Sequence, residues 1–129
     1  SLYPTNPTLR ATDLGSFGVT SLSSVPLFGG TTRVVGVFND KDHRYEIGVR
    51  LPPLPGSGRH PTGKFRVRHR KGQGTASILT DVPGNTFEYD GYDTELFFEG
   101  STVLEDIDGI ELWFIDSTGK EQFVWRSYC

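Results

Sequence analysis

The chain has 129 residues, of which 35% are hydrophobic and 12% aromatic, and its formal net charge is −3. This length suits one domain with its own core. The negative charge argues against a nucleic-acid binder, and no apolar run is long enough for membrane insertion. Cys129 is the single cysteine, which excludes an internal disulfide. We expect the chain to be one domain of a longer protein.

The predicted elements are almost all β-strands. Residues 1–16 are expected to form an extended arm, and residues 17–129 a single domain. Residues 33–38 and 45–51 predict a hairpin with one buried face, because apolar and polar residues alternate in the second of these runs. A loop rich in proline and glycine follows at 52–58. Further strands are expected at 64–70, 75–80, 85–89, 94–99, 110–115 and 122–128.

About eight or nine short antiparallel strands, separated by frequent turn signals, predict an all-β fold. The architecture expected is a single-domain β-sandwich or jelly-roll-like barrel. Neighbouring aromatic residues in a strand must point to opposite faces. Of Phe97 and Phe98, and likewise of Trp113 and Phe114, one member is therefore expected in the core and the other in a second core or at an interface.

Charge is unevenly distributed along the chain. Residues 59–71 hold six of the thirteen Lys and Arg residues, whereas residues 81–121 hold twelve of the sixteen acids. This division predicts one basic and one acidic region, unless the two halves interleave. Complementary regions favour association of identical subunits, through orientation and specificity more than through affinity.

Residues 64–71 carry the densest run of positive charge. Side-chain alternation places four cations on one face of a strand, opposite Phe65, Val67 and His69. Such a ladder predicts contact with an acidic or sulfated glycan, a phosphate, or the acidic surface of a neighbour. The alternative is a solvated or edge strand whose charges prevent aggregation. The four cations of this basic ladder are Lys64, Arg66, Arg68 and Arg70.

Asp106 and Asp108 form an acidic pair next to Gly109. In an extended segment both carboxylates point the same way, and carboxylate oxygens suit Ca²⁺. Two carboxylates do not fill a coordination sphere of six to eight oxygens, so other loops, waters or a second subunit would complete the site. The alternative is a solvated turn whose acids accept hydrogen bonds from backbone amides.

Little in the sequence indicates catalysis. The three histidines have no metal-binding spacing, the serines lack a nucleophile-elbow context, and Cys129 is terminal. A hydrolase that uses paired carboxylates stays open, since acids are plentiful. We expect a domain that is not an enzyme.

The run Asp106-Ile107-Asp108, a few residues before Trp113 in a β-rich domain, resembles the protruding domain of a nodavirus capsid protein. The opening Ser1-Leu2-Tyr3 and the polar arm after it are similar to that family as well. The resemblance implies a spike on the virion surface that self-associates as a homodimer or homotrimer and contacts a host receptor. It also implies calcium bound by Asp106 and Asp108 near a subunit contact.

Gly109 departs from the family pattern, because a basic residue is usual at that position in the fish-virus members. The function expected is therefore a surface-exposed assembly and attachment domain, with a viral capsid spike as the specific form. The alternative is a secreted, extracellular carbohydrate-binding module similar to a lectin.

Overall fold

The computed structural model describes residues 23–39, 44–72, 77–101 and 107–128. The arm predicted for residues 1–16 lies outside these ranges. The described residues form eight strands and no helix, and they contain no helix that could cross a membrane. The strands are β1 (Ser23–Leu27), β2 (Gly30–Asn39), β3 (Arg44–Arg50), β4 (Gly63–Lys71), β5 (Ile78–Tyr89), β6 (Glu95–Ser101), β7 (Gly109–Asp116) and β8 (Glu121–Tyr128).

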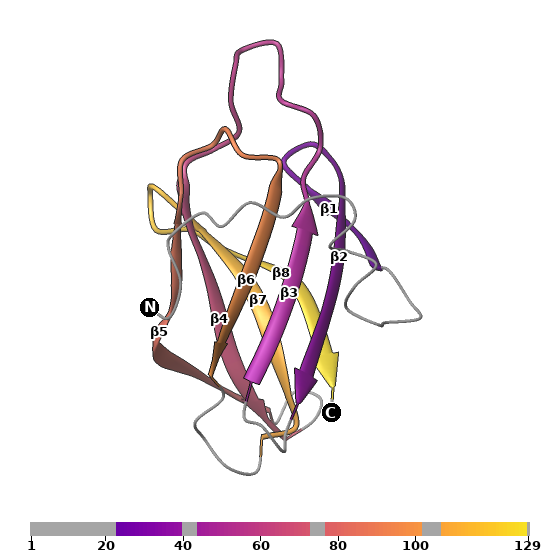
Figure 1. The fold of residues 1–129 in the computed structure, drawn as a ribbon. Helices are drawn as coiled ribbons and strands as arrows, with labels where there is room; N and C mark the ends of the chain where they lie inside the picture. The colour runs from indigo at the N-terminus through magenta and orange to yellow at the C-terminus, as the bar shows by residue number, and fades with distance from the viewer. Residues whose placement is uncertain (1–22, 40–43, 73–76, 102–106, 129) are drawn as a thin grey trace.

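The strands build two antiparallel sheets that pack face to face, which confirms the predicted β-sandwich (Figure 1). The first sheet has the order β1-β2-β3-β6, and the second has the order β5-β4-β7-β8. Consecutive strands form hairpins within each sheet, as in β2–β3, β4–β5 and β7–β8. The chain crosses between the sheets after β3, β5 and β6.

The core lies between the sheets and is rich in aromatic rings. The Phe65 ring centre lies 5.4 Å from that of Tyr89, 5.3 Å from that of Phe98 and 5.1 Å from that of Phe114. These residues come from four strands, β4, β5, β6 and β7, so the cluster joins the two sheets. Burial of such large rings supplies much of the hydrophobic stabilisation of a domain of this size.

The sequence-based strand predictions are mostly confirmed, with two differences. The sequence does not predict β1, because five residues that include Pro26 carry little β signal. Residues 78–89 form one continuous strand, whereas the sequence predicts two separate strands at 75–80 and 85–89. Pro83-Gly84 lies within this strand. The register between β4 and β5 shifts there, between Arg66 and Arg68, so the strand continues through an irregularity.

The predicted alternation of adjacent aromatic residues is confirmed. Phe98 and Phe114 are buried in the core, whereas Phe97 and Trp113 are half-buried on the outer faces. One side chain of each pair therefore lies near the surface, as the two-residue period of a strand requires.

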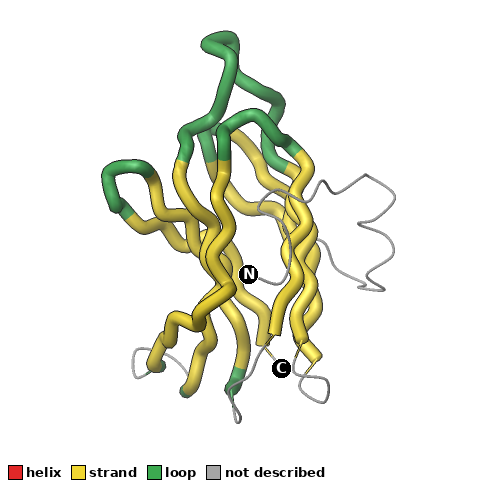
Figure 2. Tube along the Cα trace, turned by 60° about the vertical axis from the view of Figure 1, so that its left-hand side comes forward, coloured by secondary structure: helices red, strands yellow, loops and turns green. Residues whose placement is uncertain are grey.

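The loop between β3 and β4 projects from one end of the sandwich (Figure 2). Its stem is fixed by backbone hydrogen bonds, from Leu51 N to Thr94 O at 2.7 Å and from His60 N to Gly91 O at 2.8 Å. Residues 53–59 between these anchors are all exposed. The loop is thus attached firmly at its base and open to solvent along its length.

Candidate functional site: the outer face of the second sheet

The basic ladder lies on the outer face of the second sheet. On β4, Phe65, Val67 and His69 are buried toward the core, so the alternating Lys and Arg residues point the other way. β4 lies between β5 and β7, so it is an inner strand, and the edge-strand alternative is wrong. The structure therefore brings all four predicted residues, Lys64, Arg66, Arg68 and Arg70, onto one face.

Acids from the other strands of the sheet neutralise this ladder. Arg68 donates from Nε to Asp81 Oδ1 at 2.6 Å and makes a second ion pair, from Nη1 to Glu121, at 2.6 Å. Arg66 contacts the same Asp81 at 3.3 Å. Lys64 lies 4.0 Å from Glu88, with both side chains largely exposed. The basic and acidic halves of the sequence thus interleave, strand by strand.

Burial and hydrogen bonding act in opposite directions on Arg68. Burial disfavours its charged form, but the hydrogen bonds to Glu121 and Asp81 favour it more, so its pKa is raised. The two ion pairs also fix the orientation of its guanidinium group. A planar group with several donors is suited to such a double bridge.

Glu111 of β7 is the centre of a second, buried charge cluster. Its side chain is 1% exposed, and it accepts hydrogen bonds from Arg70 Nη1 at 2.9 Å, Arg126 Nε at 2.6 Å and Trp113 Nε1 at 3.0 Å. A buried carboxylate is costly unless charge and hydrogen bonds compensate it. Here two arginines and an indole do so, and they fix the orientation of Trp113.

Two adjacent aromatic rings on this face are flanked by two arginines. The Arg68 guanidinium lies 5.1 Å from the centre of the Trp113 ring, and the Arg126 guanidinium lies 4.8 Å from that of Phe123. The two rings meet edge to face at 5.8 Å, and Phe123 is 41% exposed. We call Arg68, Trp113, Phe123 and Arg126 the outer-face cluster.

Sequence reasoning identifies Arg68, and it expects one of Trp113 and Phe114 to lie outside the main core. It misses Glu111, Glu121 and Arg126. Strand alternation on β7 and β8 is the signal that points to an outward Glu111. The pairing of Glu111 with Arg126 across the two strands requires the register, which the sequence does not give.

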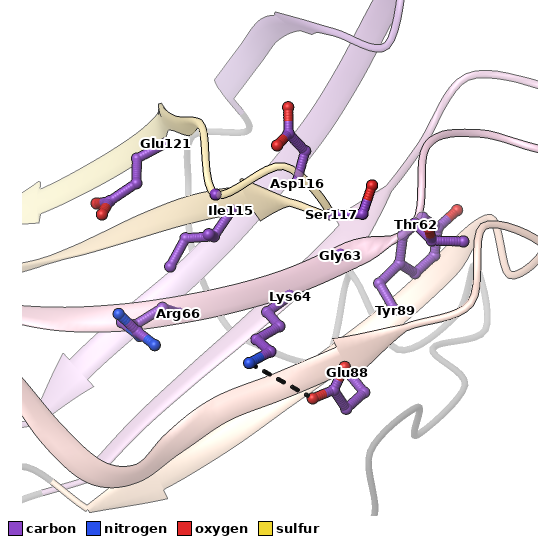
Figure 3. A pocket seen from close by; sticks show the side chains of 11 residues that line it. Thr62, Gly63, Lys64, Arg66, Glu88, Tyr89, Ile115, Asp116, Ser117 and Glu121 are labelled. Atoms are coloured by element: carbon purple, nitrogen blue, oxygen red, sulfur yellow. Dashed lines mark ion pairs between the residues drawn. The ribbon is translucent and has the colours of Figure 1, made fainter.

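An open groove of about 440 Å³ lies at one end of the same face (Figure 3). Lys64 of β4 is paired with Glu88 of β5 on one side and with Ile115 of β7 on the other. A β-carbon on Gly63 would collide with the Ile115 carbonyl oxygen. The turn of Asp116 also lines the groove. The lining residues include Thr62, Gly63, Lys64, Glu88, Ile115, Asp116, Ser117 and Glu121.

Asp116 organises the turn between β7 and β8. Its Oδ1 accepts hydrogen bonds from Thr118 Oγ1 at 2.6 Å, Thr118 N at 2.9 Å and Lys120 N at 3.0 Å. The Thr118 hydroxyl, with the two backbone amides, lowers the pKa of this carboxyl group. Asp116 is therefore engaged in turn geometry.

The predicted calcium pair is only partly within the described residues. Asp106 lies outside them, whereas Asp108 is placed: its Oδ2 accepts a hydrogen bond from Gly72 N at 2.5 Å. That contact fits the turn alternative for Asp108. In the part of the chain that the structure describes, no group of three or more His, Cys, Asp or Glu residues is arranged to hold a metal ion.

His69 lies on the core side of β4, behind the ladder. It is 1% exposed, and neither ring nitrogen has a hydrogen-bond partner among the described residues. Burial lowers the pKa of His69, although the backbone of Ser101 acts in the opposite direction. His69 is accordingly a core residue, and its side chain takes no part in the outer face.

Comparisons with known proteins give no relative for this chain. No protein-family model matches it, and neither does any curated protein or solved structure. The function is therefore argued from the geometry of the second sheet.

Proposed function

We propose that this chain is a non-enzymatic domain for assembly and attachment, and that attachment uses the outer face of the second sheet. The outer-face cluster is the observation that supports this proposal. Trp and Arg are the side chains that most often dominate binding energy at protein interfaces. In this cluster Trp113 is fixed by Glu111 and Arg68 before any partner arrives, so little side-chain freedom is lost on binding.

The charge pattern of this face favours a protein partner over a polyanion. Arg66, Arg68, Arg70 and Arg126 already pair with acids of the same sheet. A polyanion would have to compete with those carboxylates for each guanidinium group. A protein surface can instead pack an apolar group against Trp113 and Phe123 and leave the ion pairs in place.

Selection of peptides from a random display library against the immobilised domain tests this proposal, because the library samples many partner chemistries at once. Interface clusters of this kind are expected to select aromatic or aliphatic peptides. Binding of those peptides should weaken at least tenfold in Trp113→Ala and in Phe123→Ala. Tyr92→Ala is the matched control, since Tyr92 is 54% exposed but lies outside the outer-face cluster. Peptides that bind all three variants as they bind the wild type would contradict the proposal.

A lectin-like function is the second candidate, and one observation favours it. Trp113 lies directly opposite Arg66 in the β4–β7 register, so an aromatic residue does lie alongside the basic ladder. The groove next to Lys64 and Glu88 is also open, and several charged and hydroxyl side chains line it. A glycan array separates the candidates: binding that is confined to glycans and lost in Lys64→Gln supports the lectin, whereas an array without signal supports protein attachment.

The capsid-spike function and its calcium ion stay predictions that rest on Asp106-Ile107-Asp108 and Trp113. A ligand that binds only the folded state raises stability, so calcium should raise the melting temperature relative to a chelator. Asp106→Asn should abolish that shift. An unchanged melting temperature at millimolar calcium, or the same shift in Asp106→Asn, would rule out the proposed metal site.

A further inference from the structure

Among the described strands, β5 forms an edge of the second sheet, and this edge is apolar at Ile78 and Leu79. β5 pairs with β4 alone among the described strands and forms the left-hand edge of that sheet in Figure 1. The segment 78–81 is exposed at every residue, with Ile78 64% and Leu79 38% exposed. Because adjacent side chains point to opposite faces, both faces of this segment meet solvent. Unpaired backbone groups on such an edge are a template for another strand.

The segment 78–81 itself carries none of the devices that usually protect an edge, and the Pro83 and register shift that follow in β5 limit strand pairing to this short stretch. Natural edges carry Lys, Pro or inward charges that repel a second strand. The one charge in 78–81 is Asp81, and its carboxylate is occupied by Arg68 at 2.6 Å and Arg66 at 3.3 Å on its own sheet. Residues 78–81 therefore present apolar and hydroxyl side chains, and the one acid among them is already paired with two arginines.

We propose that two copies of this chain associate by antiparallel pairing of their β5 edges, about a two-fold axis at Leu79. Residues that are directly opposite in an antiparallel pair point to the same face. This axis places Leu79 against Leu79 of the second copy, and Ile78 against Thr80 of the second copy. Asp81 then lies opposite residue 77, so the two Asp81 side chains are about 13 Å apart along the strands.

This pairing is self-complementary, which is why a second copy is the occupant we infer. It matches an apolar residue with itself and a β-branched residue with another β-branched residue, and it opposes no like charges. The two four-stranded sheets become one continuous sheet. The inference deepens the assembly half of the proposed function, on which it rests, and it leaves Trp113 and Phe123 free for attachment. Because the segment is short, we expect weak, concentration-dependent association.

Disulfide trapping tests the register directly. In a Cys129→Ser background, Leu79→Cys should form a cross-linked dimer under mild oxidation, because opposite β-carbons about 5 Å apart lie close to disulfide geometry. Leu54→Cys is the matched control, since Leu54 is 41% exposed but lies in the projecting loop. A mixture of Ile78→Cys and Thr80→Cys proteins should give cross-linked heterodimers. Equal cross-linking of the Leu79→Cys and Leu54→Cys proteins would overturn the register.

Sedimentation velocity at rising concentration tests the association itself. Leu79→Lys should lower the dimer fraction at least fivefold, and Leu54→Lys should leave it unchanged, with thermal melts to show that both variants fold. A wild-type domain that stays monomeric at millimolar concentration overturns the inference. So does a dimer that persists in Leu79→Lys. In that second case assembly still stands by another surface, and the peptide selection on Trp113 reports on attachment independently.

Discussion

The Arg68 guanidinium lies 5.1 Å from the centre of the Trp113 ring while it bridges Asp81 on β5 and Glu121 on β8. One side chain of β4 thus contacts all three other strands of its sheet. A lysine keeps the charge but lacks the planar fork and the stacking surface. The contribution of these contacts can be measured as a change in the free energy of unfolding.

Arg68→Lys should destabilise the domain by about 1–2 kcal/mol in urea unfolding, because one of two short charge-assisted hydrogen bonds and the ring contact are lost. Arg66→Lys is the matched control on the same face, and its effect should be smaller, since the Arg66 side chain is 25% exposed whereas that of Arg68 is 11% exposed. Equal stabilities of wild type and Arg68→Lys would show that the double bridge contributes nothing.

Glu111→Gln should cost about 3–5 kcal/mol, because it removes the charge that compensates the buried Arg70. Glu88→Gln removes one charge of an exposed ion pair on the same sheet. Its ion pair with Lys64 is 4.0 Å long and largely exposed, so the change should be within about 0.5 kcal/mol. Chemical denaturation of both proteins gives the comparison. Similar losses in the two variants would contradict the special role of the buried cluster.

Tyr45→Phe should leave stability unchanged or raise it by up to about 1 kcal/mol, since removal of an unpaired buried polar group recovers its desolvation cost. Tyr45 is fully buried, and its hydroxyl group has no hydrogen-bond partner among the described residues. Tyr89→Phe should instead destabilise by about 1 kcal/mol, because the Tyr89 hydroxyl donates to Asp93 O at 2.7 Å. Thermal melts that rank the two variants in the reverse order would refute this account.

The buried His69 should make the domain sensitive to acid. Its pKa in the folded state is lowered by burial from an ordinary value of 6.5, so below that pH the unfolded chain takes up a proton that the folded chain does not. Stability from this residue is present above pH 6.5 and is lost as the pH falls through that value toward the lowered pKa.

His69→Leu should therefore flatten the dependence of the unfolding free energy on pH between about 7 and 5. Urea unfolding at a series of pH values measures this slope. The carboxylates contribute equally in both proteins, so the difference between wild type and variant isolates His69. An identical slope in the two proteins would mean that His69 takes up its proton equally in the folded and unfolded states, which would contradict a lowered pKa.

The fold is largely predictable because its strands alternate clearly. β3 and β4 have one buried and one polar face, and that pattern survives in the structure. β1 and the continuity of β5 are not predictable, since Pro26 and Pro83 interrupt the local signal and only pairing with β2 and β4 makes these segments strands.

The candidate site is predictable only in part. Alternation places Arg68 and Arg70 on one face, but which acids they meet depends on strand order. β4 is flanked by β5 and β7, so acids from distant parts of the chain neutralise the ladder. The uneven charge along the sequence therefore does not become two charged regions on this sheet.

The projecting loop between β3 and β4 can tolerate changes in its length and sequence. Its anchors at Leu51 and His60 hold the two ends together whatever lies between them. Residues 53–59 contribute little to the core, and lengthening a closed loop costs little additional entropy. This end of the sandwich is thus a place where insertions and sequence drift can accumulate while the eight strands keep their register.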